Sequence, residues 1–262
     1  MKRISILGSG WLGKALASTL TQAGNQLKLS TRSPDKLALL RESGFDSYLV
    51  DIDKHQPIDG AFLDADTLII NITSKNKEGF ARLIRDIENS SLQQVLFVSS
   101  SSVYQNLNRE VSEDEGAENP DSPLFEIEQL FRQCPAFQTT VVRFSGLVGP
   151  GRHPGRFFRG GKTIKQVDAP INLIHFDDCI GIIMAIIEQD CWGEVFNGCS
   201  DSHPPKREFY RYASELAGTD FPALADPAPP AYKIVTNKKV KQRLGYQFQH
   251  PDLMQLAQEH YE

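Results

Sequence analysis

Three glycines near the start of the chain have the spacing of a phosphate-binding turn. Gly8, Gly10 and Gly13 follow a short apolar run at 3–7 and open an amphipathic helical pattern that ends at Gly24. In such a unit the first glycine permits the tight turn, the second lets a pyrophosphate approach the backbone, and the third lets the helix pack closely. The pattern predicts dinucleotide binding, and its alternative is a purely structural glycine turn.

The end of the second apolar run indicates which dinucleotide is bound. An acidic residue there holds the ribose hydroxyls of NAD, but this chain has Thr31, Arg32 and Ser33, followed by Lys36. A guanidinium between two hydroxyls suits a 2′-phosphate, so we expect NADP(H) rather than NAD(H); the alternative is a surface arginine. Asp51 and Ile52 follow the third run and are placed either to contact the adenine or simply to end a strand.

Alternating strands and helices must position these residues. Apolar runs with little polar alternation, each followed by a helical pattern, are typical of a parallel sheet covered on both faces. We expect strands at 3–7, 26–30, 47–50, 67–72, 95–98 and 139–144, and helices after Gly10, after Ser33, at 78–89 and at 122–133. The prediction is an α/β, doubly wound parallel sheet, the Rossmann fold.

The regular alternation of strand and helix patterns is interrupted after Gly149. A glycine- and proline-rich loop leads to a strand near 171–174, a helix at 178–188 and a strand at 194–197. Beyond residue 203 we expect short helices around a proline-rich connector, 222–230, and an amphipathic segment from Pro251. The predicted domains are a Rossmann domain over 1–152, to which 172–200 return, and a smaller C-terminal, substrate-side lobe over 201–262 with the loop 153–171.

Composition excludes several classes of protein. The 262 residues are 40% hydrophobic with a net charge of −5, so nothing favours nucleic acid or an anionic membrane as a partner. The four cysteines are scattered, which predicts no metal site and a cytoplasmic location. The basic start and the A-x-A motif at 15–17 imitate a secretory signal, but Lys14 and the glycines interrupt the apolar stretch.

Five segments in this order resemble the extended short-chain dehydrogenase/reductases, the NAD(P)-dependent epimerase/dehydratase family. They are GSGWLG at 8–13, FVSSSSVY at 97–104, VSEDE at 111–115, VRFSGLVGPG at 142–151 and NLIHFDD at 172–178. The resemblance implies that the cofactor is bound by the glycine loop with Trp11 and Leu12, by Asn71, Ile72, Thr73 and Ser99, and by Phe144, Gly146 and Leu147 beside the nicotinamide. It also implies a substrate side that includes Arg152, Phe157 and the connector, and dimerisation through the helices at 78–89 and 122–133.

One family feature is missing. The family uses a Y-x-x-x-K pair on the helix after the acidic loop, but that stretch reads NPDSPLFEIE at 119–128. No lysine lies between Lys77 and Lys162, and Tyr104 is the only tyrosine in that interval. Loss of a positioned general acid typically costs about 10²–10⁴-fold in rate. The chain therefore resembles the atypical, YeeZ-like branch, for which the resemblance supplies no settled substrate.

Several groups are candidates for the missing role. Ser100 and Ser101 can orient a substrate oxygen but do not ionise near neutral pH, whereas Tyr104 has suitable chemistry at a position where the family normally anchors a loop. His175 titrates near neutrality, with a structural role as the favoured alternative. We expect His153 to be an exposed loop histidine that a substrate could reach.

Three charged features are interpreted as structural. Arg143 must be paired if it is buried in its strand. The acidic segment 110–118 has no histidine among its carboxylates, so we expect a solvated loop and no metal. Lys238, Lys239, Lys241 and Arg243 form a basic helix face that we expect to be solvated.

Two functions remain open from the sequence. The first is an NADP(H)-dependent oxidoreductase, epimerase or dehydratase acting on a small polar, nucleotide-sugar-like molecule. The second is a non-catalytic NADP(H)-binding redox sensor or regulatory protein. The missing Tyr–Lys pair favours the second, whereas the retained Ser100 and a separate C-terminal lobe favour the first.

Overall fold

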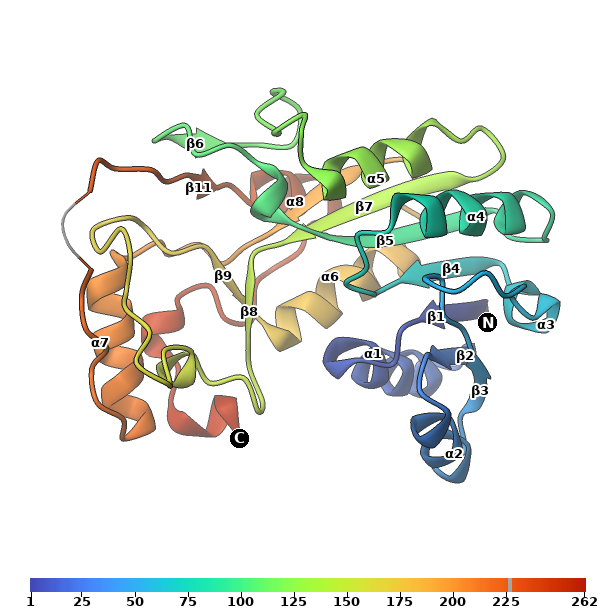
Figure 1. Ribbon diagram of the computed structural model, residues 1–262, viewed down its shortest axis with the longest axis horizontal. Coiled ribbons are helices and arrows are strands. Elements are labelled where there is room, and N and C mark those ends of the chain that lie inside the picture. Colours follow the sequence, from blue (N-terminus) through green and yellow to red (C-terminus); the bar gives the residue numbers. More distant parts are fainter. Residues whose placement is uncertain (226–227) are drawn as a thin grey trace. The chain divides into compact units, whose positions relative to one another are not determined.

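A seven-stranded parallel sheet is the central element of the computed structural model, which describes residues 1–225 and 228–262 (Figure 1). The strand order is β10-β7-β5-β4-β1-β2-β3. The strands are β1 (Arg3–Leu7), β2 (Gln26–Thr31), β3 (Asp46–Leu49), β4 (Thr67–Ile70), β5 (Gln94–Ser100), β7 (Gln138–Phe144) and β10 (Val195–Gly198). The order reverses at β1, because β2 and β3 lie on one side of it and β4 and β5 on the other. Such a switch point is where ligands bind in open α/β sheets. The predicted doubly wound α/β fold is confirmed.

Serine side chains cap the N-terminal ends of two of the helices. Ser33 accepts a hydrogen bond from the backbone N–H of Lys36, and Ser122 accepts one from that of Phe125; each is followed by proline at the first helical position. The α-helices are α1 (Trp11–Gln22), α2 (Pro34–Glu42), α3 (Gly60–Leu63), α4 (Lys77–Glu88), α5 (Pro123–Gln133), α6 (Phe176–Glu188), α7 (Lys206–Ala217) and α8 (Lys238–Leu244). The expected helices therefore form, and α6 begins two residues earlier than its predicted start.

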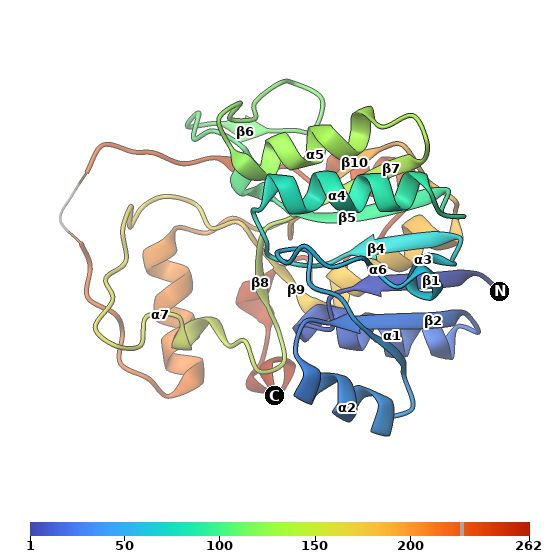
Figure 2. The same cartoon turned by 45° about the vertical axis from the view of Figure 1, so that its right-hand side comes forward.

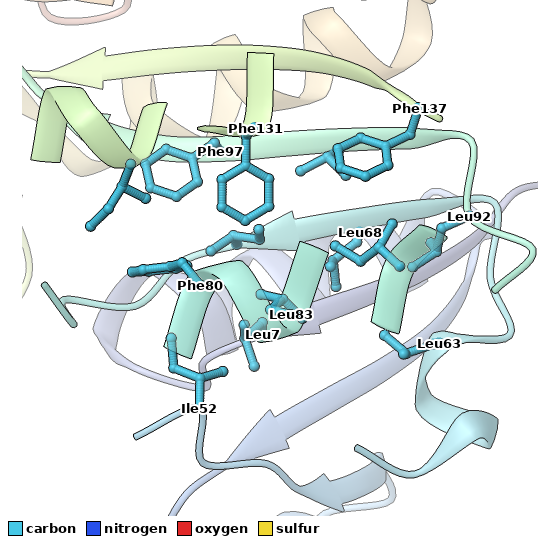
Figure 3. Packing of buried hydrophobic residues seen from close by; sticks show 14 of the residues in the cluster. Leu7, Ile52, Leu63, Leu68, Phe80, Leu83, Leu92, Phe97, Phe131 and Phe137 are labelled. Atoms are coloured by element: carbon cyan, nitrogen blue, oxygen red, sulfur yellow. The ribbon is translucent and has the colours of Figure 1, made fainter. Parts of the chain in front are cut away.

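The chain divides into two compact units. The first comprises 1–99, 120–142 and 186–195, and α4 and α5 lie side by side in it (Figure 2). Figure 3 shows its core, in which Phe80 of α4, Phe97 of β5 and Phe131 of α5 pack with ring centroids 5.3–5.9 Å apart. Each side chain of this size contributes about 1.5–3 kcal/mol when fully buried. Leu7, the last residue of β1 before the glycine loop, belongs to the same cluster.

The second unit comprises 100–119, 143–185 and 196–262. Its own core gathers Val148, Leu173, Phe209 and Leu253 with neighbouring apolar side chains. Short strands accompany the helices: β8 (Gly146–Val148) pairs with β9 (Leu173–His175), and β6 (Glu110–Val111) pairs with β11 (Ile234–Val235). The predicted domain boundaries at 152 and 201 remain a prediction.

Some local expectations for the C-terminal part needed correction. The segment from Pro251 forms two short 3₁₀ turns, 253–255 and 258–261, where an amphipathic segment was expected. Residues 226 and 227 of the expected proline-rich connector lie outside the described residues. Within the described parts of the chain, no helix is long and apolar enough to cross a membrane.

Candidate functional site

The glycine loop is held by close packing at two of its three glycines. Gly8 adopts a φ of +109°, and a Cβ there would lie 2.4 Å from the carbonyl oxygen of Asn71. A Cβ on Gly13 would lie 2.0 Å from the carbonyl oxygen of Gly8. Both distances are shorter than any real Cβ contact, so the tight turn from β1 into α1 requires glycine at both positions.

Gly10 differs from Gly8 and Gly13 because no other residue lies close to the position of its missing side chain. It is the N-cap of α1, and a Cβ built on it would meet no atom within 4 Å. The free space therefore lies where the helix presents its first backbone N–H groups. A helix N-terminus with open backbone beside it fits a pyrophosphate.

A cavity of about 340 Å³ lies over this loop, within the first unit. Its walls come from the ends of β1, β2 and β4 and from the segment after β3. Ten of the sequence-predicted cofactor residues line it: Gly8, Gly10, Thr31, Arg32, Ser33, Asp51, Ile52, Asn71, Ile72 and Thr73. Trp11, Leu12 and Gly13 belong to α1 and are not among the lining residues. The carboxyl ends of the parallel strands meet at one edge of the sheet, which is why Leu7 and Ser74, 67 positions apart, share this cavity.

Four charged residues line this cavity, namely Arg32, Lys36, Asp51 and Asp53. The Arg32 side chain is 77% exposed, and its guanidinium lies 4.0 Å from the Asp53 carboxylate. The ammonium of Lys36 donates a hydrogen bond to the carbonyl of Ser9, and the hydroxyl of Ser74 donates one to Asp53 at 2.8 Å. An exposed guanidinium and an ammonium thus lie beside the hydroxyls of the β2 end.

Sequence reasoning missed four polar residues that line the same cavity, namely Ser9, Ser30, Asp53 and Ser74. Ser30 accepts a hydrogen bond from the backbone N–H of Gly8, so it supports the loop from the neighbouring strand. Ser9 carried a weak signal because it lies inside the glycine motif. Asp53 follows β3 and Ser74 follows β4, which are not neighbours in the sheet, and only the folded arrangement of the segments after these strands brings the two residues together.

The serines at the end of β5 are engaged in local hydrogen bonds. Ser99 is buried, and its hydroxyl donates to the carboxylate of Glu128, which is also buried. Ser100 caps the following 3₁₀ turn by accepting from the backbone N–H of Ser102 at 3.1 Å. The Ser101 hydroxyl lies 3.2 Å from that of Ser145. Ser100 keeps a half-buried side chain, whereas Ser101 is buried.

Tyr104 is the centre of a buried polar network. Its hydroxyl donates to Asn197 Oδ1 at 2.9 Å and accepts from the guanidinium of Arg143 at 2.8 Å. Arg143 is fully buried and also pairs with the carboxylate of Glu118, as its burial requires. Burial raises the pKa of the Tyr104 hydroxyl well above its usual range, although the nearby Arg143 acts in the opposite direction. This environment keeps Tyr104 protonated and holds it in place.

The acidic segment is not simply a solvated loop, so that expectation was wrong. Glu113 is buried and accepts a hydrogen bond from the backbone N–H of Asn197 at 2.7 Å, and burial raises its pKa. Glu118 turns inward to Arg143. The basic helix face of α8 also contacts this segment, since Lys238 pairs with Glu110. The two charged features recognised separately in the sequence therefore neutralise each other in part.

Residues expected beside the nicotinamide do not line the described cavity. Phe144 is buried at the end of β7, and a Cβ on Gly198 would lie 2.4 Å from its ring. Gly146 and Leu147 belong to β8, which pairs with β9. Their role toward a cofactor remains a prediction.

Of the residues expected on the substrate side or within its reach, Arg152 is exposed and Phe157 packs half-buried against the core of the second unit. The expectation of an exposed His153 was wrong. Its side chain is buried; Nδ1 accepts from the backbone N–H of Gly155, and Nε2 lies 3.1 Å from Gln258 Oε1. Burial lowers the pKa of His153. His175 is also buried, at the end of β9.

More than half of the chain matches a known protein family. Residues 8–166 match the family described as NAD(P)H-binding. Over 268 residues the chain is 32% identical to Protein YeeZ of Escherichia coli K12, covering 96% of this chain and 97% of that protein.

Solved structures show the same fold. A functionally unknown conserved protein from Silicibacter pomeroyi is similar with a TM-score of 0.79 at 23% identity, covering 96% of this chain and 95% of that one. UDP-glucuronic acid 4-epimerase from Bacillus cereus, solved with NAD, has a TM-score of 0.75 at 16% identity, with 98% of both chains covered. At these identities the likeness shows the fold alone.

Proposed function

Because this chain belongs to the NAD(P)H-binding family, within the extended short-chain dehydrogenases/reductases, we propose that it binds NADP(H) and uses it on a small polar substrate. The reaction class is that of an oxidoreductase, epimerase or dehydratase, and a nucleotide-sugar-like molecule is the substrate we favour. A fold shared with a UDP-glucuronic acid 4-epimerase supports this substrate class.

The observation that carries the proposal is the chemistry of the cavity over the glycine loop. The backbone around Gly10 is open to a pyrophosphate, and Arg32 with Lys36 supplies two positive charges next to the hydroxyls of Thr31 and Ser33. This set fits a 2′-phosphate at the adenosine end. The carboxylate of Asp53 receives a hydrogen bond from Ser74 and an electrostatic contact from Arg32, so its charge is partly balanced.

A proton must be transferred to or from the substrate without the tyrosine and lysine that the family uses. When bound, the nicotinamide supplies or accepts a hydride. We assign the orientation of a substrate oxygen to the hydroxyl of Ser100, with Ser101 beside it. Since serine does not ionise near neutral pH, the proton that the substrate oxygen gains or loses as the hydride moves exchanges with water.

A second candidate function is an NADP(H)-binding redox sensor. One observation favours it: the only tyrosine between Lys77 and Lys162 is Tyr104, and the structure commits its hydroxyl to Asn197 and Arg143. A sensor requires binding of the cofactor and no positioned general acid.

Titration of the purified protein with NADPH and NADH tests the cofactor assignment. A charge-assisted contact contributes about 1.5–3 kcal/mol, so Arg32→Ala should weaken NADPH binding by about tenfold or more and leave NADH nearly unchanged. Arg132→Ala, which removes an exposed arginine from α5, is the matched control. Equal losses for both cofactors in Arg32→Ala would refute the NADP(H) preference.

Turnover separates the two functions. NADPH absorbance is followed with aldehydes, ketones and nucleotide sugars, and product analysis detects an epimerase that regenerates its cofactor. Substrate conversion that falls in Ser100→Ala supports the enzyme. NADPH binding without conversion of any of these substrates supports the sensor.

A further inference from the structure

Two histidines and an aspartate converge at the start of α6, within the second unit. His175 ends β9, Asp177 lies in the first turn of α6, and His250 lies in the segment after α8. His250 Nε2 is 2.9 Å from Asp177 Oδ2, and His175 Nδ1 is 3.2 Å from the same oxygen. One ligand atom from each residue lies within 4.8 Å of the others. None of the three lines the cavity over the glycine loop.

The hydrogen bonds of His175 decide which nitrogen carries its lone pair. Nε2 lies 3.1 Å from the carbonyl oxygen of His260, which can only accept, so Nε2 carries the proton. Nδ1 is then an acceptor. It receives a long hydrogen bond of 3.3 Å from the backbone N–H of Asp177 and also faces the Asp177 carboxylate. A neutral nitrogen lone pair opposite a carboxylate oxygen is an arrangement that a cation between them stabilises.

The same bond is the usual support of a metal-binding histidine. Such histidines donate their second ring N–H to a carbonyl or carboxylate, which fixes the tautomer and the ring orientation. The His260 carbonyl does this for His175.

His250 is also held in place by its neighbours. The buried carboxylate of Asp178 accepts from the backbone N–H groups of Gln249 and His250 and from the hydroxyl of Tyr246. Asp178 therefore positions the segment that carries His250 and is itself a positioning residue, not a ligand. The His175 and His250 rings lie 4.0 Å apart between centroids.

The cluster is closed on its inner side and open on its outer side. The His175 side chain is 1% exposed and that of His250 13%, whereas that of Asp177 is 44% exposed. A cation can enter from solvent past Asp177, and water can complete its coordination.

We propose that His175 Nδ1, Asp177 and His250 Nε2 bind a divalent transition-metal ion of the Zn²⁺ class. Two imidazole nitrogens and one carboxylate oxygen suit Zn²⁺ better than Mg²⁺ or Ca²⁺, which prefer oxygen ligands. Metal–ligand distances of about 2.0–2.2 Å require the three atoms to lie about 3.4 Å apart, so small side-chain rotations complete the site. His250 then carries its proton on Nδ1.

The bound ion ties the end of β9 and the start of α6 to the segment after α8. Asp177 and His250 lie 73 positions apart in the sequence. Sequence spacing gave no indication of this site, because His250 lies far along the chain from His175 and Asp177. The inference is independent of the proposed cofactor and substrate.

Zinc binding by the full-length protein tests this inference. Protein stripped with a chelator and dialysed is titrated with Zn²⁺ in competition with a chromophoric chelator, and its melting temperature is recorded with and without Zn²⁺. Co²⁺ serves as a visible probe of imidazole coordination. The variants are Asp177→Asn and His250→Gln; the matched controls are His55→Gln and Asp35→Asn, which change exposed residues outside the cluster.

We expect one Zn²⁺ per chain, a higher melting temperature with Zn²⁺, and visible Co²⁺ absorption. Loss of an outer partner alone weakens metal sites by about 10–100-fold, so each ligand variant should lose at least about tenfold in affinity. The controls should bind as the parent protein does. Parent protein that binds no Zn²⁺, or folded Asp177→Asn and His250→Gln that both retain parental affinity, would overturn the assignment.

Discussion

The guanidinium of Arg143 donates a hydrogen bond to the hydroxyl of Tyr104 at 2.8 Å, and neither side chain reaches solvent. A buried guanidinium is stable only when its charge and its N–H groups are satisfied. Glu118 supplies the charge, and Tyr104 connects the pair to Asn197. The buried network around Tyr104 is thus organised around an ion pair.

Replacing Glu118 with glutamine should strongly destabilise the protein. Removing one partner of a buried ion pair leaves an uncompensated charge and typically costs about 3–5 kcal/mol. The matched control is Glu115→Gln, because Glu115 pairs with Arg109 at the surface, where a pair contributes less than about 1 kcal/mol. Urea unfolding measures both changes. Similar losses in the two variants would show that burial does not set the strength of the Arg143 pair.

Tyr104→Phe tests the structural role of the tyrosine. It removes a hydroxyl from two buried partners, so the free energy of unfolding should fall by about 1–3 kcal/mol. NADPH affinity, measured below the melting temperature, should remain unchanged. Tyr48→Phe, which removes only a long hydrogen bond to the exposed Asp46, should have little effect on stability. Full stability in Tyr104→Phe would contradict the structural role.

Gly10→Ala should affect the ligand and not the fold. A Cβ at Gly10 meets no protein atom within 4 Å, so the variant should unfold at nearly the parental urea concentration. The added methyl group occupies the space assigned to the pyrophosphate, and NADPH affinity should fall by at least about tenfold, or 1.4 kcal/mol. Gly60→Ala is the control, since its Cβ also meets nothing and Gly60 does not line the cavity. Parental NADPH affinity in Gly10→Ala would place the pyrophosphate elsewhere.

Gly13→Ala, unlike Gly10→Ala, should destabilise the fold. Its Cβ would lie 2.0 Å from the carbonyl oxygen of Gly8, so the turn between β1 and α1 must shift. We expect a loss of stability of about 1–3 kcal/mol, as for overpacking elsewhere in proteins. Thermal unfolding without any ligand measures it, and a parental melting temperature would contradict the packing described for this loop.

The stability of the protein should fall in mild acid partly because of His153. Burial lowers the pKa of His153 in the folded chain, whereas in the unfolded chain it titrates near its usual value of about 6.5. As the pH falls below about 6.5, the unfolded state takes up a proton that the folded state resists, so the unfolding free energy decreases. One proton corresponds to a slope of at most about 1.4 kcal/mol per pH unit.

His153→Asn tests this contribution because asparagine can still accept from the backbone N–H of Gly155 but does not titrate. Urea unfolding between pH 5 and pH 8 should show a shallower pH dependence for the variant than for the parent protein. The exposed His55, replaced by glutamine, should leave the parental slope unchanged. Parallel curves for the parent and His153→Asn would remove His153 as a source of acid sensitivity.

Local patterns in the sequence determined the sheet, most helix limits and the glycine loop. Gly8, Gly10 and Gly13 lie within six residues, and Ser33 precedes the helix it caps, so the physical causes lie in neighbouring residues. Arg32 was found in the same way, since it follows its strand directly. The sequence also required Arg143 to be paired, because its strand is apolar and must be buried.

Tertiary structure alone decided which partners and which surfaces these residues have. His153 is buried against Gln258, 105 positions later, and Glu118 turns inward to Arg143. Asp53 and Ser74 line the same cavity although β1 and β2 separate their strands, β3 and β4, in the sheet. The burial and the pairing of a side chain depend on segments that are distant in the sequence and that folding brings together. The local periodicity of hydrophobic residues carries no information about those contacts. For the same reason, no sequence motif predicts that Asp177 and His250 lie in contact in the folded chain.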